Sequence, residues 1–208
     1  MESAPADSTT TERWQNRAMP LGRTVAVILA VLALGVLGGC GDSRTRPPDL
    51  STVQPPGATK TVGYLHDRLQ FRAPVKWTIA TGSAPMVVTL GSGSALITIW
   101  RYPRSQKQPL PDSLPELQQA RSALIAAAGA RDPTFRVIAS AVVGINNVPA
   151  VELDALETIR GHVRRVRSTH LYANGAEIVV DEYASEDLFH TVDRTVFSPL
   201  LHSVRLVG

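Results

Sequence analysis

The sequence predicts an α+β domain with a mostly antiparallel sheet, and three observations support that class. Runs rich in Val, Ile and Thr are separated by Gly, Asn and Pro turn signals, which is typical of strands joined by hairpins. Helical periodicity is confined to two segments, residues 113–128 and 185–197. These helices do not alternate regularly with the strands, which favours antiparallel pairing over a parallel βαβ arrangement.

Two pairs of strands are expected in the first half of the domain. The first pair flanks the turn His66-Asp67-Arg68, and the second flanks Gly91-Ser92-Gly93-Ser94. The Gly-Ser run lacks a third glycine and a following helix, so we interpret it as a hairpin turn and not as a phosphate-binding loop. The expected strands are residues 62–65, 69–73, 86–90 and 95–101.

The first helix begins at a recognisable cap. Ser113 and Glu116 have the spacing of a capping box, in which each side chain binds the other residue's backbone N–H. Pro115 lies in the first turn, where its missing N–H costs little. Apolar residues then repeat at helical spacing until residue 128, and Pro133 prevents continuation.

Four long strands follow, and one turn sets their register. Asn174-Gly175 is a strong signal for a type I′ hairpin, which places Ala173 opposite Ala176. Counting back from that turn pairs Ser168 with Asp181, His170 with Val179, and Arg167 with Glu182. The expected strands are residues 134–143, 148–159, 163–173 and 176–184. A second helix is expected from residue 185 to Pro199, before a final short strand at residues 203–207.

This order of elements resembles the PsbP-like fold, which is shared by the photosystem oxygen-evolving subunit, the Ran-release nuclear import factors and many small bacterial lipoproteins. The local features that carry the resemblance are Phe71-Arg72-Ala73-Pro74 leading to Trp77, Val143-Gly144 leading to Pro149-Ala150, and Phe197 followed by Leu201-His202-Ser203-Val204. The resemblance covers residues 61–207. It implies a sheet between helical layers, an α/β/α sandwich, and the role of a binding or assembly module.

Residues 1–39 are interpreted as a secretory signal peptide. Residues 24–39 carry no charge and follow three arginines, but at sixteen residues they are too short for a spanning helix, which needs about 20. Leu37-Gly38-Gly39-Cys40 resembles a bacterial lipobox, which implies that Cys40 carries a diacylglycerol and acyl lipid. Met19 also begins a complete signal, so Met1 and Met19 both stay open as the start.

Residues 40–60 are expected to form a tether between that lipid and the folded domain, residues 61–208. Four prolines make this segment semi-extended. The chain therefore resembles a bacterial membrane lipoprotein of the actinobacterial type with a PsbP-like domain. The expected location is the outer face of the cytoplasmic membrane, where two acyl chains would give stable anchoring.

Composition excludes several classes of site. One cysteine rules out a disulfide within the chain and a four-cysteine zinc site. A net charge of +3 is far from that of a nucleic-acid-binding domain. The histidines have no metal-ligand spacing, so neither a metal nor a cofactor beyond the lipid is expected; they are His66, His162, His170, His190 and His202.

Two polar clusters were weighed as sites. Ser168, His170 and Asp181 share one sheet face, but Asp181 lies opposite the serine and not beside the histidine. We expect Asp181 to bond Ser168 directly and leave His170 without a third group, so the cluster is interpreted as structural. The second cluster is a basic run that we interpret either as a solvated, paired face or as a patch for an anionic partner; it comprises Arg160, Arg164, Arg165 and Arg167.

The expected function is that of a non-catalytic module which binds a protein or an envelope ligand outside the cytoplasm. One alternative is a carrier of a lipid or small apolar ligand, which a pocket of several hundred Å³ would favour. A less favoured alternative is an envelope hydrolase, which perturbed acids converging in a cleft would favour. A flat, exposed apolar patch would instead favour binding of a protein partner.

Overall fold

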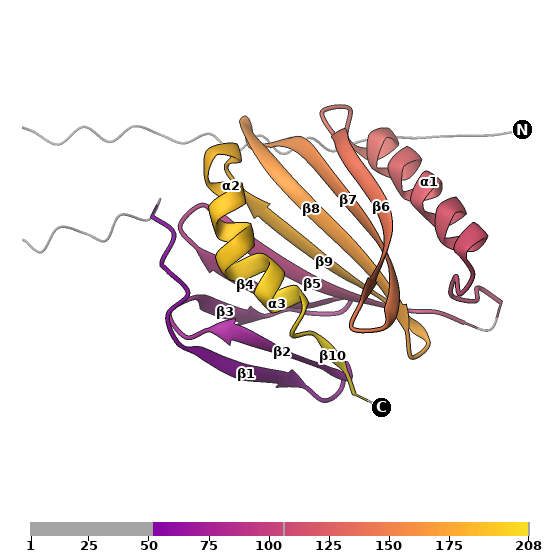
Figure 1. Ribbon diagram of the computed structural model, residues 1–208, viewed down its shortest axis with the longest axis horizontal. Helices are drawn as coiled ribbons and strands as arrows, with labels where there is room; N and C mark the ends of the chain where they lie inside the picture. Colours follow the sequence, from indigo (N-terminus) through magenta and orange to yellow (C-terminus); the bar gives the residue numbers. More distant parts are fainter. Residues whose placement is uncertain (1–51, 106, 208) are drawn as a thin grey trace, which may run out of the picture. The chain divides into compact units, whose positions relative to one another are not determined.

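The computed structural model describes residues 52–105 and 107–207, and its architecture is α+β with antiparallel strand pairs (Figure 1). The segment expected to be a signal peptide, residues 1–39, and Cys40 lie outside the described residues. The elements are β1 (Thr59–Tyr64), β2 (Leu69–Pro74), β3 (Thr78–Thr81), β4 (Met86–Ser92), β5 (Ala95–Pro103), α1 (Leu114–Arg131), β6 (Arg136–Ile145), β7 (Val148–Ile159), β8 (His162–Ala173), β9 (Ala176–Ala184), α2 (Glu186–Val192), the π-helical turn η1 (Asp193–Phe197), α3 (Ser198–Leu201) and β10 (Arg205–Leu206).

The strands form two sheets. The larger has the order β3-β4-β5-β9-β8-β7-β6, and the smaller has the order β1-β2-β10. Every pair within them is antiparallel. The pairing of β5 with β9 joins the two halves of the large sheet across a long stretch of chain that includes α1.

Two cores fill the opposite faces of the large sheet. The main core joins the α2–α3 segment, the small sheet and one face of the large sheet, with Phe71, Trp77 and Phe197 among its largest members. The second core is smaller and lies beneath α1, where Leu117 packs with Leu153 and Tyr172. Helices therefore cover both faces, as expected of a sheet between helical layers. None of the described helices is long and apolar enough to cross a membrane.

The expected hairpin register is confirmed. Asn174 and Gly175 both have positive φ, at 51° and 68°, as a type I′ turn requires. Ala173 pairs with Ala176, and counting outward gives the expected partners of Arg167, Ser168 and His170. The capping interaction of α1 is also present, because Glu116 accepts the Ser113 backbone N–H at 3.2 Å.

Three elements differ from expectation. The last helical segment does not end at Pro199, because a π-helical turn precedes α3 and Pro199 falls in the first turn of α3, where no donor is needed. The short edge strand β3 was not expected. The first strand also begins earlier than residue 62, because β1 starts at Thr59; before it, the Gln54 carbonyl accepts a hydrogen bond from Trp77 Nε1 at 3.2 Å.

Candidate functional site

A cavity of about 760 Å³ lies between α1 and the large sheet. Helix α1 packs mainly on β6 and β7, which leaves the neighbouring part of the same face, on β8, β9 and β5, open beneath its C-terminal half. Small side chains such as Ala127 and Ala128 line the helix side of this cavity. A volume of this size is typical of a small-molecule site.

Aromatic rings and charged groups line the cavity together. The rings are Trp100, Tyr102, Phe135 and Tyr183. The ionisable groups with polar side chains are Arg104, Arg131, Glu157, His170, Glu177 and Asp181. Because polar and apolar walls are mixed, the cavity suits a ligand that has both characters better than a purely apolar one.

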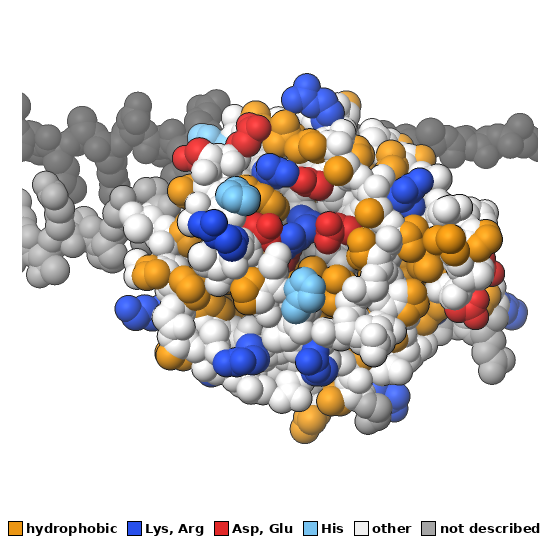
Figure 2. All heavy atoms as spheres, viewed as in Figure 1, with side chains coloured by type: hydrophobic (Ala, Val, Ile, Leu, Met, Phe, Trp, Pro, Cys, Tyr) orange, Lys and Arg blue, Asp and Glu red, His pale blue; other side chains and the backbone are white. Residues whose placement is uncertain are grey.

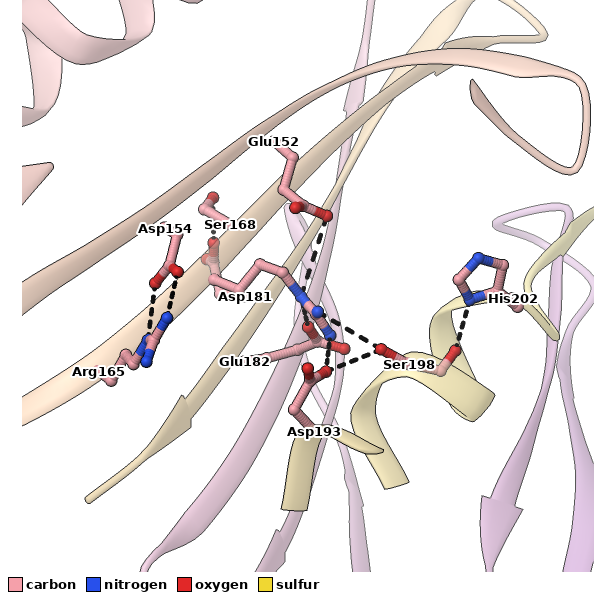
Figure 3. Close-up of polar contacts among 10 residues, drawn as sticks. Glu152, Asp154, Arg165, Ser168, Asp181, Glu182, Asp193, Ser198 and His202 are labelled. Carbon is pink, nitrogen blue, oxygen red and sulfur yellow. Dashed lines mark hydrogen bonds and ion pairs between the residues drawn. The ribbon is translucent and has the colours of Figure 1, made fainter. Parts of the chain in front are cut away.

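A continuous hydrogen-bond chain crosses the cavity floor from β5 to β9 and β8. Trp100 Nε1 donates to Asp181 Oδ2 at 3.0 Å, and Ser168 Oγ donates to Asp181 Oδ1 at 2.6 Å (the latter contact is drawn in Figure 3). Ser168 Oγ also lies 3.2 Å from His170 Nε2. His170 Nδ1 in turn lies 2.7 Å from Glu177 Oε1, and Glu177 is paired with Arg104.

This chain corrects one expectation about the histidine. His170 does have a third group, because Glu177 stands beside its Nδ1. Glu177 lies on the same face as Val179, the residue directly opposite His170, and two residues nearer the turn, so its contact with His170 is diagonal across the strand pair. The expected Ser168–Asp181 contact is confirmed.

The hydrogen bonds also determine what Ser168 can do. A hydroxyl has one hydrogen, and here it is donated to Asp181. With that hydrogen committed, the contact with His170 requires Nε2–H to donate to the serine oxygen, and a histidine that donates there cannot take the serine proton. The hydrogen bonds therefore form a satisfied polar floor, in which the Ser168 hydrogen is directed to Asp181 and not to His170.

The carboxyl groups of the cavity experience different electrostatic surroundings. Burial opposes ionisation of Glu177, but hydrogen bonds from His170 and Arg104 outweigh it and lower the Glu177 pKa. Burial raises the pKa of Asp181, against the hydrogen bond from Ser168. Burial likewise raises the pKa of Glu157. Among the described residues, neither Asp181 nor Glu157 forms an ion pair.

The four arginines of the expected patch do not gather in one place. Arg164 points to the cavity side of β8, where it donates to the Ser94 carbonyl at 3.4 Å, and Arg160 lies in the β7–β8 turn. Arg165 forms a two-point contact with Asp154, at 3.0 and 2.5 Å (Figure 3). Its guanidinium also lies over the Phe189 ring.

Arg167 is the most enclosed of the four. Its side chain is 11% exposed and lies 2.6 Å from Glu182 and 2.6 Å from Asp193. On the face of the molecule seen in Figure 2, acidic and basic side chains lie next to one another beside α2 and α3. Arg165 and Arg167 are thus neutralised by carboxylates, and the four arginines form no common cationic surface.

No group of three or more metal-ligating side chains occurs in residues 52–105 and 107–207. Cys40, the expected lipidation site, lies outside that range. The cavity residues that sequence reasoning missed are Trp100, Arg104, Arg131 and Glu157. They come from β5, the loop after it, α1 and β7, and no local pattern signals that these segments meet.

Comparisons with known proteins identify the fold. No family model and no curated protein matches the sequence. Among solved structures, PsbP of the cyanobacterium Synechocystis sp. PCC 6803 is 13% identical, with 83% of this chain and 98% of that chain covered and a TM-score of 0.57. This likeness shows that the domain has a PsbP-like fold.

Two further solved structures are more distant. LpqN of Mycobacterium tuberculosis, described as involved in cell envelope biogenesis, is 15% identical over 67% of this chain and 83% of its own, with a TM-score of 0.46. The Ran-binding protein Mog1p of Saccharomyces cerevisiae is 7% identical over 73% of this chain and 96% of its own, with a TM-score of 0.48.

Proposed function

We propose that the protein is a lipid-anchored, non-catalytic binding module of the cell envelope, which holds a small ligand in the cavity beneath α1. The observation that carries the proposal is the cavity itself, about 760 Å³ with aromatic walls and a polar floor. The floor is held in place by hydrogen bonds between side chains of β5, β8 and β9, so the site is largely formed before a ligand arrives.

A carrier of purely apolar ligands fits this cavity less well. Such a ligand would remove water from Asp181 and Glu157 without supplying hydrogen-bond donors, and burying a polar group without a partner is costly. A hydrolase is the second candidate, because Ser168, His170 and Glu177 are connected by contacts of 3.2 and 2.7 Å. The commitment of the serine hydrogen to Asp181 argues against it.

Occupation of the cavity can be tested by blocking it. The full chain is purified from its own cells, and molecules extracted from it are identified by mass spectrometry. Ala127 lines the cavity, so Ala127→Trp fills it, whereas Ala126→Trp adds the same ring on an exposed part of the same helix outside the cavity lining. A ligand of the cavity is expected with the natural chain and Ala126→Trp, and is expected to be lost with Ala127→Trp. Recovery of the same molecules from all three chains would contradict the proposal.

Lipid anchoring rests on the lipobox-like segment and is tested separately. Cys40→Ala removes the thiol that would form the thioether with diacylglycerol. We expect the variant to be released from membranes or to accumulate as an uncleaved precursor, while the domain keeps its circular dichroism spectrum. Membrane retention of a processed Cys40→Ala chain of unchanged mass would show that Cys40 is not the anchor.

A further inference from the structure

Two carboxyl groups in the cavity form no ion pair among the described residues. Asp181 accepts hydrogen bonds from Ser168 and Trp100, but neither donor is charged. The side chain of Glu157, on β7, has no hydrogen bond or ion pair among the described residues. The third carboxyl group, that of Glu177, is already satisfied by Arg104 and His170. Two acids of the cavity therefore remain available to a ligand.

Burial makes the lack of an ion-pair partner costly for both acids. It raises the pKa of both Asp181 and Glu157. The charge of Asp181 also contributes to the raised pKa of Glu157, so the two carboxyl groups influence each other. A poorly solvated carboxylate gains more from an incoming cation than one exposed to water, since Coulomb attraction is stronger where the effective dielectric constant is low. The open, half-shielded cavity is such a place.

Aromatic rings stand beside the same acids. Tyr183 follows Asp181 by two residues on β9 and therefore lies on the same sheet face, and Trp100 contacts Asp181 directly from β5. The negative face of an aromatic ring attracts a cation, and ammonium groups with an organic body are held by such rings together with carboxylates. Rings and acids together discriminate a cation from an uncharged molecule of the same shape.

Arg131 acts on both of these acids. It lies in the last turn of α1 and lines the cavity, and its side chain forms no hydrogen bond or ion pair among the described residues. His170, and to a smaller extent Arg131, lower the pKa of Asp181, and Arg131 also lowers the pKa of Glu157, so Arg131 acts on both carboxyl groups without contacting either. Because its side chain is exposed, Arg131 can turn toward solvent when another cation enters.

We infer that the cavity beneath α1 binds a small organic cation, an ammonium group on an apolar body, with Asp181 and Glu157 as its counter-charges and Trp100 and Tyr183 as its aromatic walls. The inference rests on the proposed binding function and names the chemical class of its ligand. Arg131 competes with the ligand for the two acids, so it sets the affinity without forming part of the cation's binding surface.

Three probes of nearly equal shape isolate the charge. Choline is the cation, 3,3-dimethylbutan-1-ol is its uncharged isostere, and 3,3-dimethylbutanoate is the anion. The trimethyl or tert-butyl protons of each give one sharp NMR signal, so affinity for the full chain in a mild nonionic detergent is measured by ligand-observed titration. We expect choline to bind about tenfold more tightly than the alcohol, in the range of cation–π and partly buried charge interactions, and the anion to bind most weakly.

Substitutions of single side chains show whether each one strengthens or weakens choline binding. Glu157→Gln is expected to weaken choline binding several-fold and to leave the alcohol unchanged, whereas Arg131→Gln is expected to strengthen choline binding several-fold. Asp187→Asn, an exposed carboxyl on α2, is the matched control and should alter neither. Ala127→Trp should abolish binding of all three probes.

The outcomes separate the ligand class from the binding function. Equal affinities for choline and the alcohol, both lost in Ala127→Trp, would leave the cavity as a binding site and overturn the cation inference. Tightest binding of 3,3-dimethylbutanoate, weakened by Arg131→Gln, would also overturn it and show that the arginines select the ligand. Failure of all three probes to bind would count against both proposals.

Discussion

Replacing Arg167 by methionine tests whether this arginine is structural. In the natural chain Arg167 contacts both Glu182, which is fully buried, and Asp193 of the π-helical turn, at 2.6 Å each. Figure 3 labels these two carboxylates, and the arginine that they contact is drawn without a label. Glu152 is a third, looser neighbour at 4.0 Å. Methionine keeps much of the length and apolar volume of the side chain and removes the charge, so Glu182 is left buried without its partner.

The magnitude follows from the cost of that stranded carboxyl group. Burial, opposed by Arg167, already raises the pKa of Glu182 from its usual 4.5 to about 7. Without Arg167 the pKa of Glu182 rises further, because Arg167 is the cation that opposes the effect of burial. Removal of one partner from a buried pair typically costs about 3–5 kcal/mol. In the natural chain Glu182 is protonated at pH 5 and mostly ionised at pH 9, so the cost of losing Arg167 should be about 1–2 kcal/mol larger at pH 9 than at pH 5, at about 1.4 kcal/mol per unit of further pKa rise.

Guanidinium chloride unfolding at about pH 9 and pH 5 measures these differences. Arg165→Met is the control, because Arg165 lies on the same strand and face but is 32% exposed, and its loss should cost about 1 kcal/mol at either pH. The double variant Arg167→Met with Glu182→Leu removes both charges and should recover most of the stability. A cost of less than 1 kcal/mol for Arg167→Met, or the same cost at both pH values, would refute the assignment of a structural role.

Three other predictions concern the core, the serine and pH. Trp77 is a core residue, because it is 3% exposed and its ring lies edge-on to the Phe197 ring with 6.4 Å between the centroids. Trp77→Ala should therefore lower the free energy of unfolding by about 3–5 kcal/mol, as measured by chemical unfolding. A stable Trp77→Ala variant would instead indicate that Trp77 contacts a ligand. Ser168 should not react with fluorophosphonate probes, and stoichiometric labelling that disappears in a folded Ser168→Ala chain would establish the hydrolase candidate. The pKa of Glu182 is higher in the folded than in the unfolded state. Its contribution to stability is therefore greatest below about pH 4.5 and declines as the pH rises to about 7. Glu182→Gln should remove that decline, and urea unfolding across this pH range measures it.

Local chemistry was sufficient to predict the elements and one long hairpin. Asn174 and Gly175 adopt the positive φ angles of a type I′ turn at little steric cost, and that turn alone sets the pairing of β8 with β9. The strand period of two then places Ser168 and Asp181 on one face, facing each other. The capped start of α1 was equally local, since Ser113 and Glu116 are three residues apart. The PsbP-like fold was expected from a loose resemblance and is supported by structural likeness, not by sequence identity.

Tertiary structure alone decided where those elements meet. The pairing of β5 with β9 brings Trp100 to Asp181 across 81 positions, and the placement of α1 over β6 and β7 leaves the neighbouring floor open. Burial of Arg167 depends on Asp193, which a π-helical turn carries over β8. Such contacts depend on the apolar area that whole layers bury together. Because burial is non-directional, the sequence of one segment does not determine which other segment it packs against. Turn and cap geometry is encoded within a few residues, whereas the cavity forms only when β5 pairs with β9 and α1 packs on β6 and β7.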